Sequence, residues 1–252
     1  MQTTLVKKMT MGMSCSNSAD GLAIPSMIKL LDAARTNSHS EMYQKWLREC
    51  GQQRTWKKWA NLSSRDKWEL LHLIELQCES VSAYIELDMV DVLERELWSV
   101  EHVVPRSTIN GSAPGTAEDD PNGWCPATRR QNSLRSNHPL VLWDDDDVKD
   151  TGVVKIMNET HWAPPIAQRA RLARKWLFIR ATYPDQVERP STAQCAHITD
   201  ILSNTERVAP SSSEVCANEH LRTKFGWSNP LIGATPSYWL CNPKFVSLII
   251  RP

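Results

Sequence analysis

The feature that most constrains the fold is a β-type segment, Trp98 to Val104, in a chain whose other apolar patterns are mostly helical. The segment is rich in β-branched residues and is bounded by Pro105. Asn-Gly, Pro-Gly and Pro-Asn-Gly signals in residues 107–123 predict a loop with room for at most a short returning strand. A helix is then predicted from about Thr128 to Asn137. We therefore expect a strand, a loop or short strand, and then a helix in this part of the chain.

Helical patterns flank this part of the chain on both sides. From Pro25 to about Glu96 the pattern is helical, and Ser63 with Asp66 three residues later predicts the start of one helix. The clearest helix is predicted from Ile166 to Tyr183, where apolar residues recur at helical spacing. Together these patterns predict a mainly helical α+β fold.

Length and composition limit the organisation of the chain. A chain of 252 residues is long enough for one sizeable core and short for two. We predict a single domain over residues 23–252, after a polar segment at residues 1–22 that is expected to be disordered. No apolar run approaches the roughly 18 residues that a membrane helix needs. Residues 1–20 also lack the continuous apolar core of a secretory signal, so an intracellular location is the default.

The seven cysteines form an odd set without paired spacing, which does not predict a disulfide framework. Reduced thiols are therefore the default. A zinc site could be drawn from Cys195 and His197, or from Cys216 and His220. No Cys-X-X-Cys pair supports either of these possible ligand sets, so a zinc site is not predicted.

Glu101 and His102 stand next to each other in the predicted strand, and Asn132 lies on the predicted helix. Histidine suits a general base, because its ordinary pKa of about 6.5 leaves it mostly neutral at neutral pH. Magnesium prefers hard oxygen ligands and keeps several waters, so one carboxylate and one amide oxygen suffice. Neighbouring strand residues point to opposite faces, so both can serve one site only if the strand bends near Pro105. An isolated Glu-His pair is usually structural, and the pattern alone leaves both interpretations open.

Charge is unevenly spread, although the formal net charge is zero. Basic residues gather in two segments, one with Arg129, Arg130 and Arg135, the other with Arg169, Arg171, Arg174, Lys175 and Arg180. Such clusters could bind phosphates, and a solvated helix face is the alternative. Tryptophans that could stack on bases or pack in the core recur in the N-terminal half, at Trp46, Trp56, Trp59 and Trp68. The aspartates at 144–147 could bind a cation or form a solvated acidic turn.

The order and spacing of these residues resemble the endonuclease I family of ββα-metal (His-Me finger) nucleases. The similarity extends over four ordered blocks between Glu101 and Ile232, and no match is found before Trp98. Asp120, Pro126, Asn132-Ser133, Arg135-Ser136-Asn137 and Pro139 are similar to the family pattern Asp-X-His-Asn-Leu-X-Pro…Asn-Ser-X-Arg-Ser-Asn-X-Pro. Residues 169–174 are similar to its Arg-Gly-X-Ile-Ala-Arg helix, and a C-terminal segment matches at Glu214, Asn218, Leu221, Gly226 and residues 229–232.

The resemblance implies a metal-dependent endonuclease that cuts DNA, with RNA as a further substrate, shows little sequence selectivity and leaves 5′-phosphate ends. It gives His102 the general-base role and makes Glu101 and Asn132 the ligands of Mg²⁺, with Mn²⁺ or Ca²⁺ as substitutes. The other expected site residues are Arg135 and Arg106 as catalytic arginines, Asp120, Asn122 and Asn137 behind the ligands, and Arg129, Arg130 and Arg174 as phosphate contacts. The ββα core is expected at about residues 98–140. We expect a monomer without a membrane partner.

Three departures from the family pattern leave a second interpretation open. Asn122 stands where the family has His, Ala170 where it has Gly, and Gly233 where it has Asp. The chain also lacks the insertion that carries the family's phosphate-stabilising arginine, and Arg106 is its substitute by position. The alternative is a nuclease-derived nucleic-acid-binding or interaction protein whose activity is weakened. The intact group of Glu101, His102, Asn132 and Arg135 favours the enzyme.

Overall fold

The computed structural model describes residues 38–51, 62–77, 98–110, 117–140, 153–156, 159–164, 166–188 and 209–233. The α-helices are α3 (Ser38–Cys50), α5 (Ser64–Gln77), α6 (Arg129–Arg135), α7 (Ile166–Thr182) and α9 (Ser212–Phe225). The strands are β1 (Trp98–His102), β2 (Trp124–Thr128), β3 (Val153–Ile156) and β4 (Glu159–Trp162). Short 3-10 turns are η2 (Arg106–Thr108), η3 (Ala117–Asp119), η4 (Pro121–Gly123) and η6 (Pro230–Ile232).

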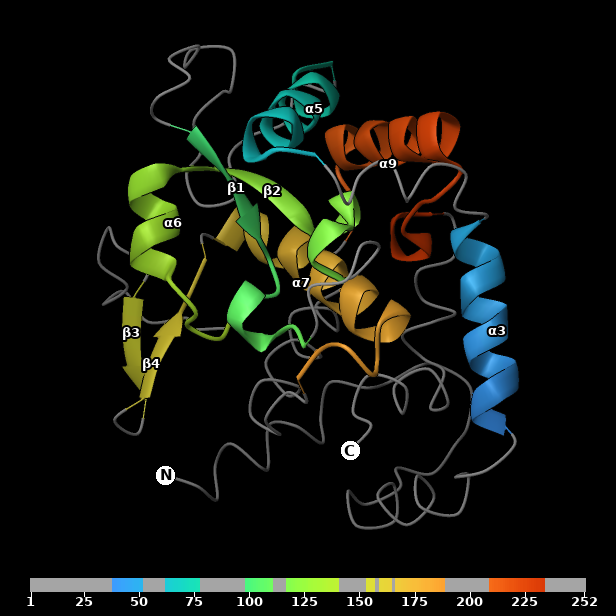
Figure 1. Ribbon diagram of the computed structural model, residues 1–252, viewed down its shortest axis with the longest axis horizontal. Coiled ribbons are helices and arrows are strands. Elements are labelled where there is room, and N and C mark those ends of the chain that lie inside the picture. The colour runs from blue at the N-terminus through green and yellow to red at the C-terminus, as the bar shows by residue number, and fades with distance from the viewer. Residues whose placement is uncertain are drawn as a thin grey trace.

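Helices and two small antiparallel sheets make this an α+β fold, as the sequence predicted (Figure 1). Several expectations fall on residues that the structure does not describe. These are the disordered segment at 1–22, the acidic run at 144–147 and the zinc alternative at Cys195 and His197.

Strands β1 and β2 form an antiparallel hairpin whose register pairs Trp98 with Thr128 and His102 with Trp124. The returning strand β2 lies outside the predicted loop of residues 107–123 and begins directly after it. β1 ends two residues before its predicted end. The reason is Pro105, which has no amide hydrogen for a sheet and leads the chain into η2.

Helix α6 follows β2 directly. The Thr128 hydroxyl accepts a hydrogen bond from Gln131 N at 3.1 Å and caps the first turn. α6 ends at Arg135, two residues before its predicted end, because Ser136 has a positive φ of 51° and leaves the helical path. The chain thus runs strand, strand, helix through this region, which brings one face of α6 against the hairpin.

Helix α7 forms the centre of the core and passes behind the hairpin in Figure 1. Its predicted range is confirmed to within one residue. All residues from Gln168 to Tyr183 are buried, including the basic ones that were expected on a solvated face or at phosphates. Arg169 Nε donates to the Pro164 carbonyl at 2.9 Å, so this buried guanidinium has a protein partner. The basic residues of α7 therefore belong to the interior of the protein.

A buried carboxylate, Asp120, ties the start of β2 to this core. Its Oδ1 accepts from the backbone and side-chain nitrogens of Asn122 at 2.9 and 3.0 Å. Its Oδ2 accepts from the Tyr183 hydroxyl at 2.9 Å and from Trp227 Nε1 at 3.0 Å. Burial raises the pKa of Asp120 to about 6, while these donors oppose the rise. The four hydrogen bonds hold η4, and hence β2, against the end of α7.

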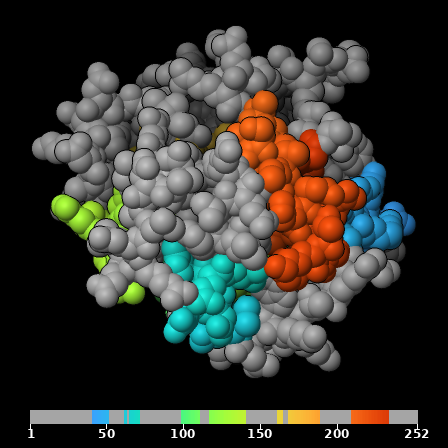
Figure 2. Space-filling view, turned by 90° about the horizontal axis from the view of Figure 1, so that it is seen from above, coloured from blue at the N-terminus to red at the C-terminus, as the bar shows by residue number. Residues whose placement is uncertain are grey.

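Helices α5 and α9 pack side by side on one face of the molecule (Figure 2). The predicted start of α5 is confirmed, because Ser63 Oγ accepts from Asp66 N at 3.2 Å and Asp66 Oδ2 accepts from Ser63 N at 3.1 Å. α9 begins with a capping box between Ser211 and Glu214 and ends at Gly226, whose φ is 69°. Among the helices described, none is long and apolar enough to cross a membrane.

The described cysteines differ in state. Cys216 is disulfide-bonded, so the expectation of a reduced thiol is wrong at this position. The same bond removes the Cys216 sulfur as a thiolate ligand for the zinc site that the sequence allowed with His220. Cys50 and Cys125 are buried thiols within the core.

Candidate functional site

A cleft of about 1140 Å³ opens where α5, β1, η2 and α6 meet. It is lined by side chains from all four elements. They are Arg65, Lys67, Trp68, Ser99, Val100, Glu101, His102, Pro105, Arg106, Ser107, Glu118, Arg129, Asn132, Arg135, Ser136 and Asn137. Glu101, His102 and Asn132, which the sequence singled out, therefore border one cleft.

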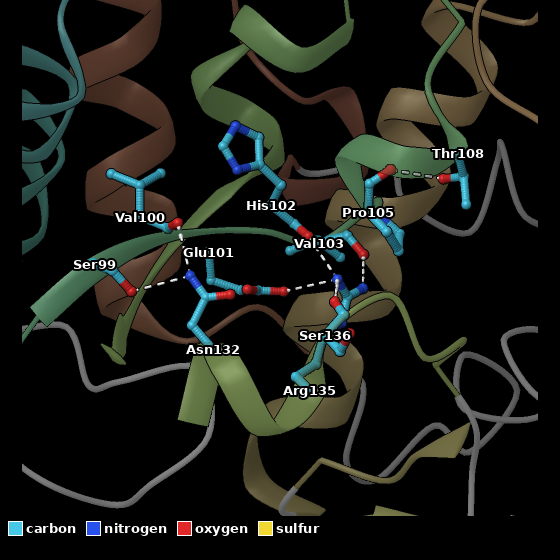
Figure 3. A network of polar contacts seen from close by, with 10 residues as sticks. All are labelled: Ser99, Val100, Glu101, His102, Val103, Pro105, Thr108, Asn132, Arg135 and Ser136. Atoms are coloured by element: carbon cyan, nitrogen blue, oxygen red, sulfur yellow. Dashed lines mark hydrogen bonds and ion pairs between the residues drawn. The ribbon is translucent and has the colours of Figure 1, made fainter. Parts of the chain in front are cut away.

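Glu101 and Arg135 form a buried ion pair on the wall of this cleft. Their side chains are each 2% exposed, and Arg135 Nη1 lies 3.1 Å from Glu101 Oε1. The same guanidinium donates to the carbonyls of His102 at 3.2 Å and Val103 at 2.7 Å, and Nη1 also donates to Ser136 O (Figure 3). Arg135 thus fastens the end of β1 to the end of α6 and holds the Glu101 carboxylate in place.

This arrangement corrects the role expected for Arg135. The sequence predicted a catalytic arginine in contact with phosphate. In the structure its terminal nitrogens donate to protein oxygens, so it is a positioning residue for Glu101.

Asn132 approaches β1 from α6 and is oriented by two hydrogen bonds. Its Nδ2 donates to Ser99 Oγ at 3.0 Å and to the Val100 carbonyl at 3.1 Å. A carbonyl can only accept, so the Val100 contact fixes which end of the amide is nitrogen. The amide oxygen consequently points toward the Glu101 carboxylate (Figure 3). The expectation that Asn132 faces His102 is therefore wrong.

The oxygens of Glu101 and Asn132 fit a hard cation. Carboxylate and amide oxygens are ligands that Mg²⁺ accepts, and the Glu101 carboxylate also carries the ion pair with Arg135. Within the described ranges there is no group of three or more His, Cys, Asp and Glu side chains that could hold a metal ion. An ion here would therefore have two protein oxygens and complete its shell with water.

His102 leaves β1 on the side opposite Glu101, as strand geometry requires (Figure 3). Its ring packs edge-on against Trp124, with centroids 6.1 Å apart. Burial, together with the nearby positive charges of Arg106 and Lys67, lowers the pKa of His102 to about 3, against the opposing hydrogen bond to the Glu118 backbone. The imidazole is therefore neutral at neutral pH. Its Nε2 is shielded from solvent and has no hydrogen-bond partner among the residues that the structure describes.

Cations outnumber carboxylates around the cleft, although the whole chain is neutral. Arg106 is 66% exposed at the side chain and pairs with Glu118 at 2.6 Å. Lys67 is mostly buried and pairs with Asp119 at 2.6 Å. Arg129 is exposed on α6 and faces the cleft as well. The cleft therefore presents a positive lining to an anionic ligand.

Two expected phosphate contacts lie elsewhere. Arg174 is buried on α7, where its Nε and Nη2 bind the two oxygens of Glu214 at 2.8 and 2.5 Å. That prediction is wrong, because α7 is the central helix of the core. Arg130 is exposed on α6 but is not among the residues that line the cleft.

The three residues that were expected to support the metal ligands, Asp120, Asn122 and Asn137, do not lie together. Asn137 is exposed and lines the cleft. Asp120 and Asn122 bond to each other in the η4 turn, with Asn122 Nδ2 donating to Asp120 Oδ1. Their described hydrogen bonds do not reach Glu101 or His102, and they act on the site through the position of β2.

Sequence reasoning missed the contribution of α5 and η3. Arg65, Lys67 and Trp68 enter the cleft from α5, and Glu118 enters from η3. The capping pattern at Ser63 placed the start of this helix, but no local signal indicated that it packs against the hairpin.

Comparison with protein-family models finds no match for this chain, and no curated protein matches it. The likeness to the endonuclease I family therefore rests on the motif residues themselves.

Proposed function

We propose that this protein is a metal-dependent endonuclease that hydrolyses phosphodiester bonds of DNA, and of RNA as a further substrate. The observation that carries the proposal is the pair of oxygen ligands, Glu101 and Asn132, turned toward each other in a positively lined cleft. His102 borders the same cleft with a neutral imidazole. These are the parts that metal-assisted hydrolysis of a phosphodiester needs: oxygen ligands, a base and cations.

In this mechanism Glu101 and Asn132 hold Mg²⁺, with Mn²⁺ or Ca²⁺ as substitutes, and the bound ion supplies Lewis-acid stabilisation of charge on the phosphate. Arg135 keeps the Glu101 carboxylate oriented through their buried ion pair. His102 turns its ring into the cleft and accepts a proton from the attacking water at Nε2. Arg106 and Arg129 bind the phosphates on either side.

A second candidate function is a nucleic-acid-binding protein with weakened activity. It is favoured by the shielded position of His102 Nε2 and by the Asn122 side chain, which bonds within its own turn. Both candidates predict binding in the cleft, and only the first predicts hydrolysis.

The nature of the cut ends tests the proposal. Supercoiled plasmid incubated with the protein and magnesium should become nicked, and DNA ligase should reseal the nicks, because hydrolysis leaves a 5′-phosphate beside a 3′-hydroxyl. Nicks that ligase cannot reseal would contradict this chemistry. Binding without any nicking would favour the second candidate.

Replacing Glu101 by Gln should raise the magnesium concentration needed for half-maximal nicking by roughly 10- to 100-fold, since a neutral amide holds the ion less well than a carboxylate. High magnesium should partly restore the rate. The variant also leaves Arg135 without its buried partner, so thermal unfolding is measured in parallel. The matched control is Glu118→Gln, a cleft residue outside the ligand pair, which should keep the parental magnesium requirement.

Arg129 and Arg130 are adjacent exposed residues of α6, and only Arg129 lines the cleft. Each phosphate contact adds to the salt dependence of binding. Arg129→Gln should therefore flatten the slope of log affinity against log salt on duplex DNA by about 0.9, and Arg130→Gln should leave it unchanged. Equal slopes for the two variants would remove Arg129 from the phosphate-binding surface.

A further inference from the structure

We propose that Trp68 forms a base-stacking subsite for single-stranded nucleic acid in the cleft beside Glu101 and Asn132. The proposal rests on the proposed function and adds to it a subsite for the bases of an unpaired strand. The first observation is exposure. Trp68 is half-buried and lines the cleft. The other tryptophans whose side chains the structure describes are 5% exposed or less: Trp46, Trp124, Trp162, Trp176 and Trp227.

Helix α5 presents the Trp68 ring from a fixed position. Lys67, the preceding residue, is tied to Asp119 at 2.6 Å and lies 5.4 Å over the ring of Trp124. Trp68 itself packs against the small apolar cluster around Leu71 and Trp124. The indole therefore contacts the core and also borders the cleft. A ring that is already ordered loses little conformational entropy when a base stacks on it.

Cations flank this aromatic surface. Arg65, three residues before Trp68 on α5, is 71% exposed at the side chain and lines the cleft. Arg129 lines the same cleft from α6. An aromatic face with cations beside it is the arrangement that binds single strands, because every base has a π-face and every linkage has a phosphate. In a duplex the bases are stacked on each other, so their faces are not available to Trp68.

The subsite belongs to a part of the chain that carries no family likeness. Helix α5 precedes Trp98, before which no residue matches the endonuclease I pattern. The motif residues and Trp68 meet only because α5 packs against β1 and β2. The proposed subsite therefore contributes to the choice of nucleic acid that is bound. It is separate from Glu101 and Asn132, the proposed ligands of the ion.

The test compares Trp68→Leu with Trp68→Phe, since Leu keeps apolar packing without a π-face and Phe keeps a ring. Binding to a fluorescent single-stranded DNA of about 12 nucleotides is measured by anisotropy in EDTA, beside the duplex of the same sequence. Trp68→Leu should weaken single-strand binding by about 5- to 150-fold and Trp68→Phe by much less. Duplex binding should change by less than about twofold, since no base face reaches the ring. Replacing bases by abasic sites should weaken binding to the parent more than binding to Trp68→Leu.

Three results would overturn the subsite. The first is single-strand binding by Trp68→Leu at the parental affinity. The second is an equal loss on single strand and duplex, which would give Trp68 a packing role only. The third is a parent protein that does not bind the single strand. Failure of the proposed function has a different signature: the parent then binds the single strand through Trp68 but does not nick plasmid in magnesium.

Discussion

Replacing His102 by Ala should lower the rate of plasmid nicking by about 10² to 10⁴ while DNA binding stays close to that of the parent. Among the described residues that line the cleft, His102 is the one histidine, and its imidazole is neutral at neutral pH. It contributes no ligand to the ion and no charge to the phosphates, so binding should not depend on it. Single-turnover nicking and anisotropy binding measure the two quantities separately.

His220 gives the matched control for this variant. It is a half-buried histidine of α9 whose Nδ1 lies 3.1 Å from the Cys216 carbonyl, and it does not line the cleft. His220→Ala should nick plasmid at the parental rate. If His102→Ala also cuts at the parental rate, His102 is not the base and the mechanism must use another group.

Replacing Arg174 by Ala should destabilise the protein by about 3–5 kcal/mol, because Glu214 would remain buried and charged without its partner. Both side chains are at most 4% exposed in the native structure. The free energy of unfolding from urea titration measures the loss. The salt dependence of DNA binding should be unchanged, since Arg174 lies in the core and not in the cleft.

The double variant Arg174→Met with Glu214→Gln separates lost charge from lost packing. Met fills the interior, and Gln keeps the side chain that caps α9 at its third position. Replacing a buried ion pair by neutral groups of similar size is often close to neutral for stability, so this variant should recover most of the loss. A loss as large as that of Arg174→Ala would show that packing and not the unpaired charge dominates.

The sequence predicted the helices and strands whose formation depends on contacts between residues that are close in sequence. Ser63 and Asp66 marked the start of α5 because a capping box is a contact between near neighbours. The range of α7 followed from apolar periodicity. The hairpin followed from the β-branched segment before Pro105 and the turn residues after it.

Roles that depend on tertiary packing were not predictable in the same way. A helix with five basic residues was expected at the surface, but α7 became central because the other elements pack around it. Arg174 consequently pairs with Glu214, forty residues away in sequence. Arg135 was expected to contact a phosphate of the substrate. In the structure it binds Glu101 and the Val103 carbonyl and so connects β1 to α6. In each case the partner is distant in sequence, so spacing along the chain carries no information about it.

The proximity of Glu101 and Asn132 was predictable from the sequence, and the residues that form the walls of the cleft were not. Glu101 and Asn132 come together because β1, β2 and α6 follow one another with short connections, which the sequence indicated. Lys67 and Trp68 reach the cleft from a helix that ends more than twenty residues before β1. Only the packing of α5 on the hairpin brings them there.

The dependence of plasmid nicking on a divalent ion tests the proposed metal-dependent mechanism most directly. Supercoiled plasmid is incubated with the parent protein in magnesium, in excess EDTA, and in EDTA followed by excess magnesium. We expect nicking in the first condition, none in the second and recovery in the third, because the proposed role of Glu101 and Asn132 is to hold the ion. Nicking that persists in EDTA, or an absence of nicking in magnesium, would contradict the assignment of this cleft as a metal-dependent nuclease site.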